Sequence, residues 1–234
     1  MIINATKLTE PSGTHDMPEF ILKDCALIAI ATRHRANTLK EFRDHILSLS
    51  QDSLYYHFWG NLLLPRFEER EYNNDFASWI KHSLHDAKLA EQLAVVDPIV
   101  FSDMEELRQH LLEYIDDRLE QSEYLQWLQS AQPFEFIRSQ IVVFNTHINI
   151  TQPSEMLVHI PNMSVSSIFY HFIDARRRTE HNIDDFRHWL ACFGATYQAL
   201  IEQLSYIDPY FSSLTELRQQ IQATFQQYFA EETP

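Results

Sequence analysis

Two pairs of histidine and aspartate carry the residue types in this sequence that could transfer protons. His57 is followed by Asp75, and His171 by Asp185, and each pair is set among aromatic residues. An imidazole oriented by a carboxylate can act as a general base in a hydrolase or transferase. The same pair can be structural, because a buried imidazole needs a hydrogen-bond partner. We favour the structural role, since no serine or cysteine stands in the context of a known nucleophile elbow.

A second candidate is a site for an anion. Arg176, Arg177 and Arg178 form the one dense basic cluster of an acidic chain, and Arg66 lies in the comparable loop of the first half. Arginine suits bidentate recognition of phosphate or carboxylate. If the helix that carries His171 continues, Arg178 lies on the same face as that histidine. The competing interpretation is a set of surface salt bridges with the acidic residues that follow the cluster.

A metal site is the weakest candidate. His82 and His85 stand three positions apart, a spacing that can hold a metal on a helix. Cys192 corresponds to His82 in the second half, but an alanine corresponds to His85. The sequence has no HExxH or CxxC motif. We therefore expect a solvated helix face there, with no metal and no other cofactor.

These residues occur in pairs because the chain repeats itself. The segment SLYYHF at 53–58 returns as SIFYHF at 167–172, and DFASW at 75–79 returns as DFRHW at 185–189. This recurrence predicts an internal duplication. Two copies are too few for a solenoid, so we expect a pair related by a pseudo-two-fold axis and closed into one compact body.

The predicted boundaries follow from the repeat. We expect a flexible leader at residues 1–18, a first repeat unit at 19–121, a packed linker at 122–134 and a second repeat unit at 135–234. The leader is rich in proline and polar residues and lacks apolar periodicity.

Each repeat unit begins with a predicted strand. Residues 135–151 are rich in β-branched and aromatic side chains, as strands are, and residues 20–32 are the corresponding strand of the first unit. Apolar residues at helical spacing then predict a series of helices in each unit. The predicted fold class is α+β and predominantly helical: two pseudo-symmetric tandem units, each one strand followed by about five helices.

Composition excludes several classes of function. The net charge of −15 argues against nucleic-acid binding and against an anionic membrane surface. The chain has only 3 glycines and no GxGxxG motif, so a phosphate-cradling loop is not expected. Neither a signal peptide nor an apolar run of about 20 residues is present. We expect a cytoplasmic protein in which Cys25 and Cys192 are reduced thiols.

The motifs together resemble a prokaryotic family of uncharacterised proteins, a domain of unknown function. The shared pattern is S-[IL]-[YF]-Y-H-F, an arginine-bearing loop, N-x-D-F-x-x-W, L-x-x-x-D-P and L-x-x-L-R, and it extends from Glu19 to Phe229. Where that family has Thr-Gly after the strand, this chain has Thr32-Arg33. The family occurs near or fused to glycosyltransferase-like proteins, so the resemblance implies a link to carbohydrate metabolism. It implies architecture and no catalytic residues.

The leading functional prediction is a non-enzymatic ligand-binding or protein-interaction module with a regulatory role. The alternative is a hydrolase- or transferase-like enzyme that uses the His–Asp pairs and an arginine-lined anion site. The partner we expect is a protein or a small anionic or sugar ligand, and a homodimer is compatible with the sequence. A deep pocket holding a histidine and an inward arginine favours the enzyme, whereas a shallow groove or exposed apolar patch favours the binding module.

Overall fold

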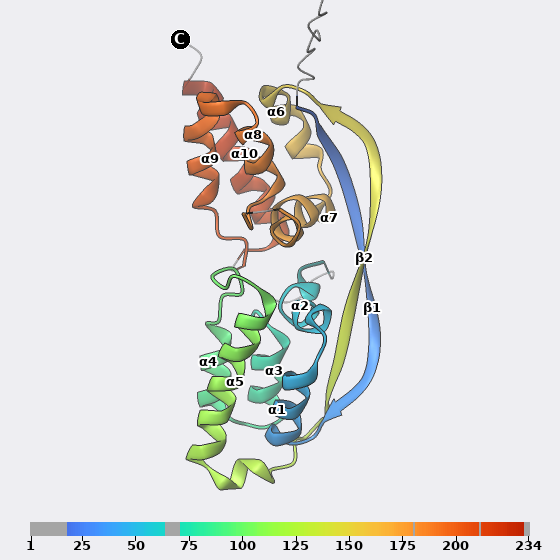
Figure 1. Cartoon of the computed structure of the whole chain (residues 1–234), viewed down its shortest axis with the longest axis vertical. Helices are drawn as coiled ribbons and strands as arrows, with labels where there is room; N and C mark the ends of the chain where they lie inside the picture. Colours follow the sequence, from blue (N-terminus) through green and yellow to red (C-terminus); the bar gives the residue numbers. More distant parts are fainter. Residues whose placement is uncertain (1–17, 64–70, 180, 211, 232–234) are drawn as a thin grey trace, which may run out of the picture.

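The computed structural model describes residues 18–63, 71–179, 181–210 and 212–231. Its backbone is organised along a two-stranded antiparallel ribbon, formed by β1 (Phe20–Ala36) and β2 (Phe134–Ile150). Two groups of helices lie on one side of this ribbon, one beyond the other along its length (Figure 1). The molecule is therefore elongated, and not the compact body that we expected.

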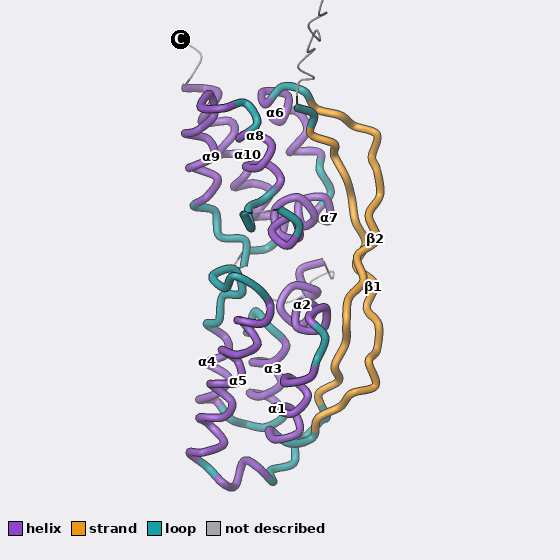
Figure 2. Tube along the Cα trace, in the orientation of Figure 1, coloured by secondary structure: helices purple, strands orange, loops and turns teal. Residues whose placement is uncertain are grey.

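Five α-helices follow each strand in the described residues. The first helical group contains α1 (Leu39–Ser48), α2 (Gln51–Trp59), α3 (Asp75–His82), α4 (Ala87–Ala94) and α5 (Met104–Gln121). The second helical group contains α6 (Met156–His159), α7 (Val165–Ile168), α8 (Asp185–Ala191), α9 (Gln198–Ser205) and α10 (Leu214–Glu231). Figure 2 shows how helix dominates over strand. The predicted class, α+β and predominantly helical, is confirmed; that the two units are copies of one segment stays a prediction.

The ribbon of β1 and β2 twists between the two helical groups (Figure 1). In the register of the ribbon, Phe20 pairs with Ile150 and Ala36 pairs with Phe134. The start of β1 therefore lies against the second helical group, where the Phe20 ring packs 5.2 Å from Phe186. The start of β2 lies against the first helical group, where the Phe134 ring packs 5.3 Å from Phe42. Each strand is shared by both groups, an arrangement that the predicted division into one strand per unit did not anticipate.

Polar caps determine where two helices near the candidate site begin. The Asn74 side chain accepts a hydrogen bond from the Ala77 amide and starts α3, and Asp184 accepts one from the Arg187 amide and starts α8. Such caps satisfy amides that the first helical turn leaves unpaired. They place Asp75 and Asp185 in the first turn, where the helix dipole stabilises a negative charge.

The repeated segments SLYYHF (53–58) and SIFYHF (167–172) are here called the first and second signature segments. The second signature segment has an irregular helix. The short helix α7 continues as a π-helical turn over Phe169–Ile173 and then as a 3-10 turn over Asp174–Arg177. The first signature segment is regular α-helix until Gly60. A side chain at Gly60 would meet the Tyr56 ring at 2.6 Å, so only glycine fits there without a shift. The second segment has Asp174 at the position of Gly60. Asp174 accepts hydrogen bonds in the candidate site, which a glycine cannot do through a side chain.

None of the helices in the described part of the chain is long and apolar enough to cross a membrane.

Candidate functional site

The first signature helix contacts the strand that leads into the other unit. His57 Nε2 accepts a hydrogen bond of 3.1 Å from the backbone amide of Ile137 in β2. Ser53, one turn earlier on α2, donates a hydrogen bond of 2.5 Å to the carbonyl oxygen of the same residue. Residues four apart lie on one face of a helix. Both backbone groups of Ile137 are therefore held by two side chains of a single helix.

The second signature segment makes the same contact with β1. His171 Nε2 accepts a hydrogen bond of 2.9 Å from the amide of Lys23, and Ser167 donates one of 2.5 Å to the carbonyl oxygen of Lys23. We call these two pairs, Ser53 with His57 and Ser167 with His171, the Ser–His clamps.

The clamps bind opposite edges of the ribbon. Each strand of a two-stranded sheet has a free edge, and a buried amide or carbonyl on it needs a partner. Because the ribbon twists (Figure 1), the β2 edge meets the first helical group at Ile137 and the β1 edge meets the second at Lys23. The clamps satisfy these edge groups and fix the ribbon to the helices.

The hydrogen bonds assign the proton on each imidazole. An amide N–H is a donor, so Nε2 of each ring must accept and Nδ1 must carry the proton. His57 Nδ1 then donates to Asp75 Oδ2 at 2.9 Å, and His171 Nδ1 to Asp185 Oδ2 at 2.8 Å. The two rings are only 2% and 3% exposed. The lone pair that a general base would use is occupied in both pairs.

The two aspartates differ in their other partners. The amide group of Asn61 donates to Asp75 Oδ1. Arg178 donates to Asp185 Oδ2 at 3.0 Å, the same oxygen that His171 contacts. Burial disfavours the charged form of Asp185, but the bond from His171 and the Arg178 guanidinium outweigh it and hold the pKa of this carboxyl below its usual value. Arg66, the predicted anion ligand of the first half, lies outside the described residues.

A buried aspartate joins the arginine cluster to the first helical group. Asp174 receives hydrogen bonds from Arg177, from Arg178 and, at 3.2 Å, from the Tyr55 hydroxyl of α2. The Arg177 guanidinium lies 4.0 Å from the Tyr55 ring centre, and that of Arg178 lies 4.0 Å from the Tyr170 ring centre. Burial and the negative charge of Asp174 raise the pKa of Tyr55 well above its usual value, so its hydroxyl remains a donor.

Arg176 differs from its two neighbours. Its Nε donates to the Phe172 carbonyl at 3.3 Å, and within the described ranges no carboxylate lies within 4.0 Å of its guanidinium. Partial burial lowers the pKa of Arg176, although the more distant Asp184 and Asp97 oppose this effect. Of the three adjacent arginines, this one lacks a carboxylate partner in the described structure.

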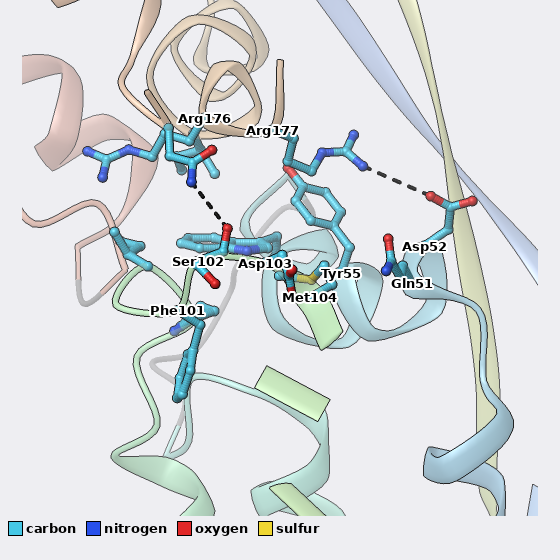
Figure 3. A pocket seen from close by; sticks show the side chains of 14 residues that line it. Gln51, Asp52, Tyr55, Phe101, Ser102, Asp103, Met104, Arg176 and Arg177 are labelled. Carbon is cyan, nitrogen blue, oxygen red and sulfur yellow. Dashed lines mark hydrogen bonds and ion pairs between the residues drawn. The ribbon is translucent and has the colours of Figure 1, made fainter. Parts of the chain in front are cut away.

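Arg176 and Arg177 line a cleft of about 370 Å³ between the two helical groups. Figure 3 shows Arg177 directed toward Asp52, 4.0 Å away, and Arg176 directed toward the other end of the cleft. Both groups contribute to the walls. The other lining residues are Gln51, Asp52, Tyr55, Trp59, Pro98, Ile99, Phe101, Ser102, Asp103, Met104, Ile173 and Asn182.

A second, more open depression of about 340 Å³ lies beside the second clamp. His171, Arg178 and Asp185 are among its lining residues, together with His188 and Cys192. The first three are engaged with one another or with the ribbon, as described above. The depression thus combines histidines with an arginine, but the His171 imidazole presents no unused nitrogen to it.

The three metal candidates belong to different segments of the fold. His82 bonds to Glu71 at 3.1 Å on the first helical group, and His85 lies beyond the end of α3 with a φ of 58°. Cys192 is at the end of α8 in the second group, with its thiol directed to the His188 carbonyl. The part of the chain that the structure describes holds no group of three or more potential metal ligands.

Sequence reasoning missed several members of the site. Ser53 and Ser167 begin the repeated motif one turn before the histidines, so the spacing contained a signal. Asp174 gave no such signal, because the residue at its position in the first half is Gly60 and the repeat marks only the residues that both halves share. Trp59 and Asn182, which line the cleft from opposite groups, also lie outside the shared motif positions.

The fold and these contacts define a class of helical α+β protein in which two helical groups clamp one shared β-ribbon. The chain belongs to DUF5752, a family of unknown function whose model matches residues 17–226. Its fold is similar to the solved structure of OrfY from Thermoproteus tenax, with a TM-score of 0.77 and 21% identity, covering 89% of this chain and 94% of OrfY. At this identity the likeness concerns the fold alone. No curated protein matches the sequence.

Proposed function

We propose that this protein is a non-enzymatic binding module whose cleft between the helical groups binds a small phosphorylated sugar. The observation that carries the proposal is the half-buried Arg176 guanidinium, which has no carboxylate partner within salt-bridge distance in the described residues. Removing a cation from water is costly unless an anion compensates it. A phosphate group placed at that end of the cleft supplies the compensating charge.

The remaining walls suit the sugar part of such a ligand. Tyr55 and Trp59 provide aromatic surface, and Gln51 and Asn182 provide side-chain amides. Small-molecule sites commonly combine apolar walls with a few polar groups that orient the ligand. Asp52 and Asp103 also line the cleft and can accept hydrogen bonds from hydroxyl groups, whereas they disfavour a ligand with phosphates at both ends.

The position of the cleft supports a regulatory role. Arg176 and Ile173 belong to the second helical group, whereas Tyr55 and Met104 belong to the first. A ligand in the cleft contacts both helical groups. It therefore stabilises the relative position of the groups in which both can contact it.

The His–Asp pairs support binding over catalysis. In our proposal they are structural, because each imidazole uses Nε2 for the ribbon and Nδ1 for the aspartate. A general base needs an accessible nitrogen near its substrate.

Thermal-shift and calorimetric titrations test the proposal. The ligands are phosphorylated hexoses, the matching neutral sugars and inorganic phosphate. We expect a phosphorylated sugar to raise the Tm and to bind at least tenfold more tightly than its neutral counterpart, since Arg176 contacts only the phosphate.

The matched variants are Arg176→Gln and Arg35→Gln. Arg35 is an exposed arginine of β1 that pairs with Glu135, away from the cleft. We expect Arg176→Gln to abolish the preference for the phosphorylated sugar and Arg35→Gln to preserve it. A flat response to every ligand, or equal losses in the two variants, overturns the proposal.

A further inference from the structure

A cavity of about 620 Å³ lies within the first helical group, apart from the cleft. Its walls are the turn between α3 and α4, the last turn of α5 and the connection from α5 to β2. Figure 1 shows this connection at the end of the first helical group that points away from the second. The cavity shares no lining residue with the cleft, and its volume suits a small molecule. We call it the distal cavity.

The charged side chains of the distal cavity favour an anion. Arg118 Nε donates a hydrogen bond of 2.7 Å to Asp86 Oδ2, and Asp86 Oδ1 accepts one of 3.2 Å from the Leu89 amide. The charge of Asp86 is thus compensated by Arg118. Lys88 bonds to the neutral side chain of Gln121 at 2.6 Å and has no carboxylate partner among the described residues. Lys88 therefore leaves an uncompensated positive charge at the cavity, in a chain whose net charge is −15.

Both cations have donors left for a ligand. Among the residues that the structure describes, Arg118 forms its hydrogen bond through Nε alone, so its terminal nitrogens are available. The Lys88 side chain is exposed, and its ammonium has more donors than the one bond to Gln121 uses. Such cations recognise the oxygens of phosphate and carboxylate groups.

An exposed tyrosine gives the distal cavity an aromatic wall. Tyr124 lies in the 3-10 turn that follows α5 and is 69% exposed. Leu125 and Leu128 supply apolar surface to the same wall. Planar rings stack favourably on an exposed aromatic side chain. The cavity therefore combines a surface for stacking with an uncompensated cation.

His85 occupies a backbone position that usually holds glycine. The Asp86 amide donates to the Ile80 carbonyl at 3.1 Å, which closes the end of α3 with His85 in the left-handed conformation at a φ of 58°. Glycine is preferred at such positions because a Cβ destabilises this conformation. The comparable turn after α8 has Gly194 with a φ of 68°. An imidazole is thus held at the wall of the distal cavity at a cost in stability, a cost that binding sites commonly carry.

We propose that the distal cavity binds a small anion that carries a planar ring, either a nucleoside monophosphate or an aromatic carboxylate. The anionic group contacts Lys88 and the terminal nitrogens of Arg118, and the ring stacks on Tyr124. His85 lines the site from the turn between α3 and α4.

Calorimetric titration of the full chain tests the proposal. The ligands are AMP with its neutral counterpart adenosine, and indoleacetate with its neutral counterpart indoleacetamide. We expect at least one of the two anions to bind, and to bind at least tenfold more tightly than its neutral counterpart. Binding of AMP alone assigns the site to a phosphate, and binding of indoleacetate alone assigns it to a carboxylate.

Matched variants locate the bound anion. Lys88→Gln is expected to abolish the preference for the anion, whereas Lys23→Gln, beside the second helical group, preserves it. Tyr124→Ala is expected to weaken binding at least tenfold. Its control is Tyr206→Ala at the end of α9, where the replaced tyrosine is 77% exposed. His85→Gly is expected to raise the Tm and to weaken binding, because glycine relieves the backbone strain but removes the imidazole.

The proposal is overturned if neither anion binds, or if Lys88→Gln and Lys23→Gln lose affinity equally. Wild-type affinity in Tyr124→Ala or in His85→Gly also overturns it. Arg176→Gln, which is expected to lose the sugar phosphate from the cleft, should bind the aromatic anion as wild type does, and a loss there places the anion in the cleft instead. Lys88→Gln should still bind the sugar phosphate, since Lys88 is not among the residues that line the cleft. The two proposals therefore fail independently.

Discussion

His171 accepts a hydrogen bond of 2.9 Å from the backbone amide of Lys23, which stands 148 residues earlier in the chain. His57 makes the equivalent contact with Ile137. Each helical group thus holds the strand that precedes the other group. A contact that links such distant segments stabilises the whole chain, so we expect the two groups to unfold together.

Replacing a clamp histidine is expected to destabilise the protein. His57→Ala leaves the Ile137 amide and Asp75 without their partner, and an unsatisfied buried group costs about 1–3 kcal/mol. The free energy of unfolding, measured in urea, should fall by at least that amount. His188→Ala, which changes an exposed histidine on α8, is the control and should be close to wild type. Wild-type stability of His57→Ala contradicts the structural role.

Asp185 should make stability depend on pH in the acid range. Its pKa in the folded protein lies below the ordinary value of 3.8, so the unfolded chain binds its proton more readily as pH falls. The stabilisation is complete well above pH 3.8 and is lost as pH falls through the folded value.

The measurement is the unfolding free energy of wild type and Asp185→Asn across pH. We expect a constant difference near neutral pH that shrinks below pH 3.8. A difference that grows with acidity has the wrong sign for this account.

Replacing the buried Asp174 should lower the free energy of unfolding more than replacing Tyr55, the tyrosine that contacts it. Tyr55→Phe removes one hydrogen bond and should cost about 1 kcal/mol. Asp174→Ala removes the acceptor for Arg177 and Arg178 as well and should cost about 2 kcal/mol or more. Thermal or urea unfolding of both variants checks the order, and a larger effect of Tyr55→Phe contradicts it.

The two thiols should differ in reactivity. Burial raises the pKa of Cys25 to about 12, and the nearby Asp174 and Asp24 act in the same direction. Thiolate is the reactive form, so iodoacetamide at pH 8 should modify the exposed Cys192 and leave Cys25 intact until the chain is unfolded. Mass spectrometry of the alkylated peptides checks this. Modification of Cys25 in the folded protein contradicts its placement.

Local sequence patterns predicted the helices and strands, whereas the contacts of the candidate site depend on pairing between distant segments. The β-branched run near Ile141 and the helical spacing around His57 reflect local physics, and both gave the correct element. The pairing of β1 with β2 depends on contacts between residues 98 to 130 positions apart, for which the sequence offers no period. The histidine and aspartate were expected to pair, but the ribbon amide on the far side of each imidazole was not expected.

The cleft, too, depends on long-range packing that the sequence did not predict. The cluster from Arg176 to Arg178 was visible as a run of charge. Which of the three arginines lacks a carboxylate partner among the described residues depends on Asp174, a residue that the repeat does not share. Side chains from α2 and from the loop before α5 complete the cleft, and only the packing of the two helical groups brings them together.

The clamp is tested most directly by long-range ¹H–¹⁵N NMR of the two imidazoles, together with hydrogen exchange of two backbone amides. We predict that His57 and His171 both carry the proton on Nδ1, and that the amides of Ile137 and Lys23 exchange at the rate of global unfolding. Protons on Nε2, with fast exchange at Ile137 and Lys23, would contradict the account.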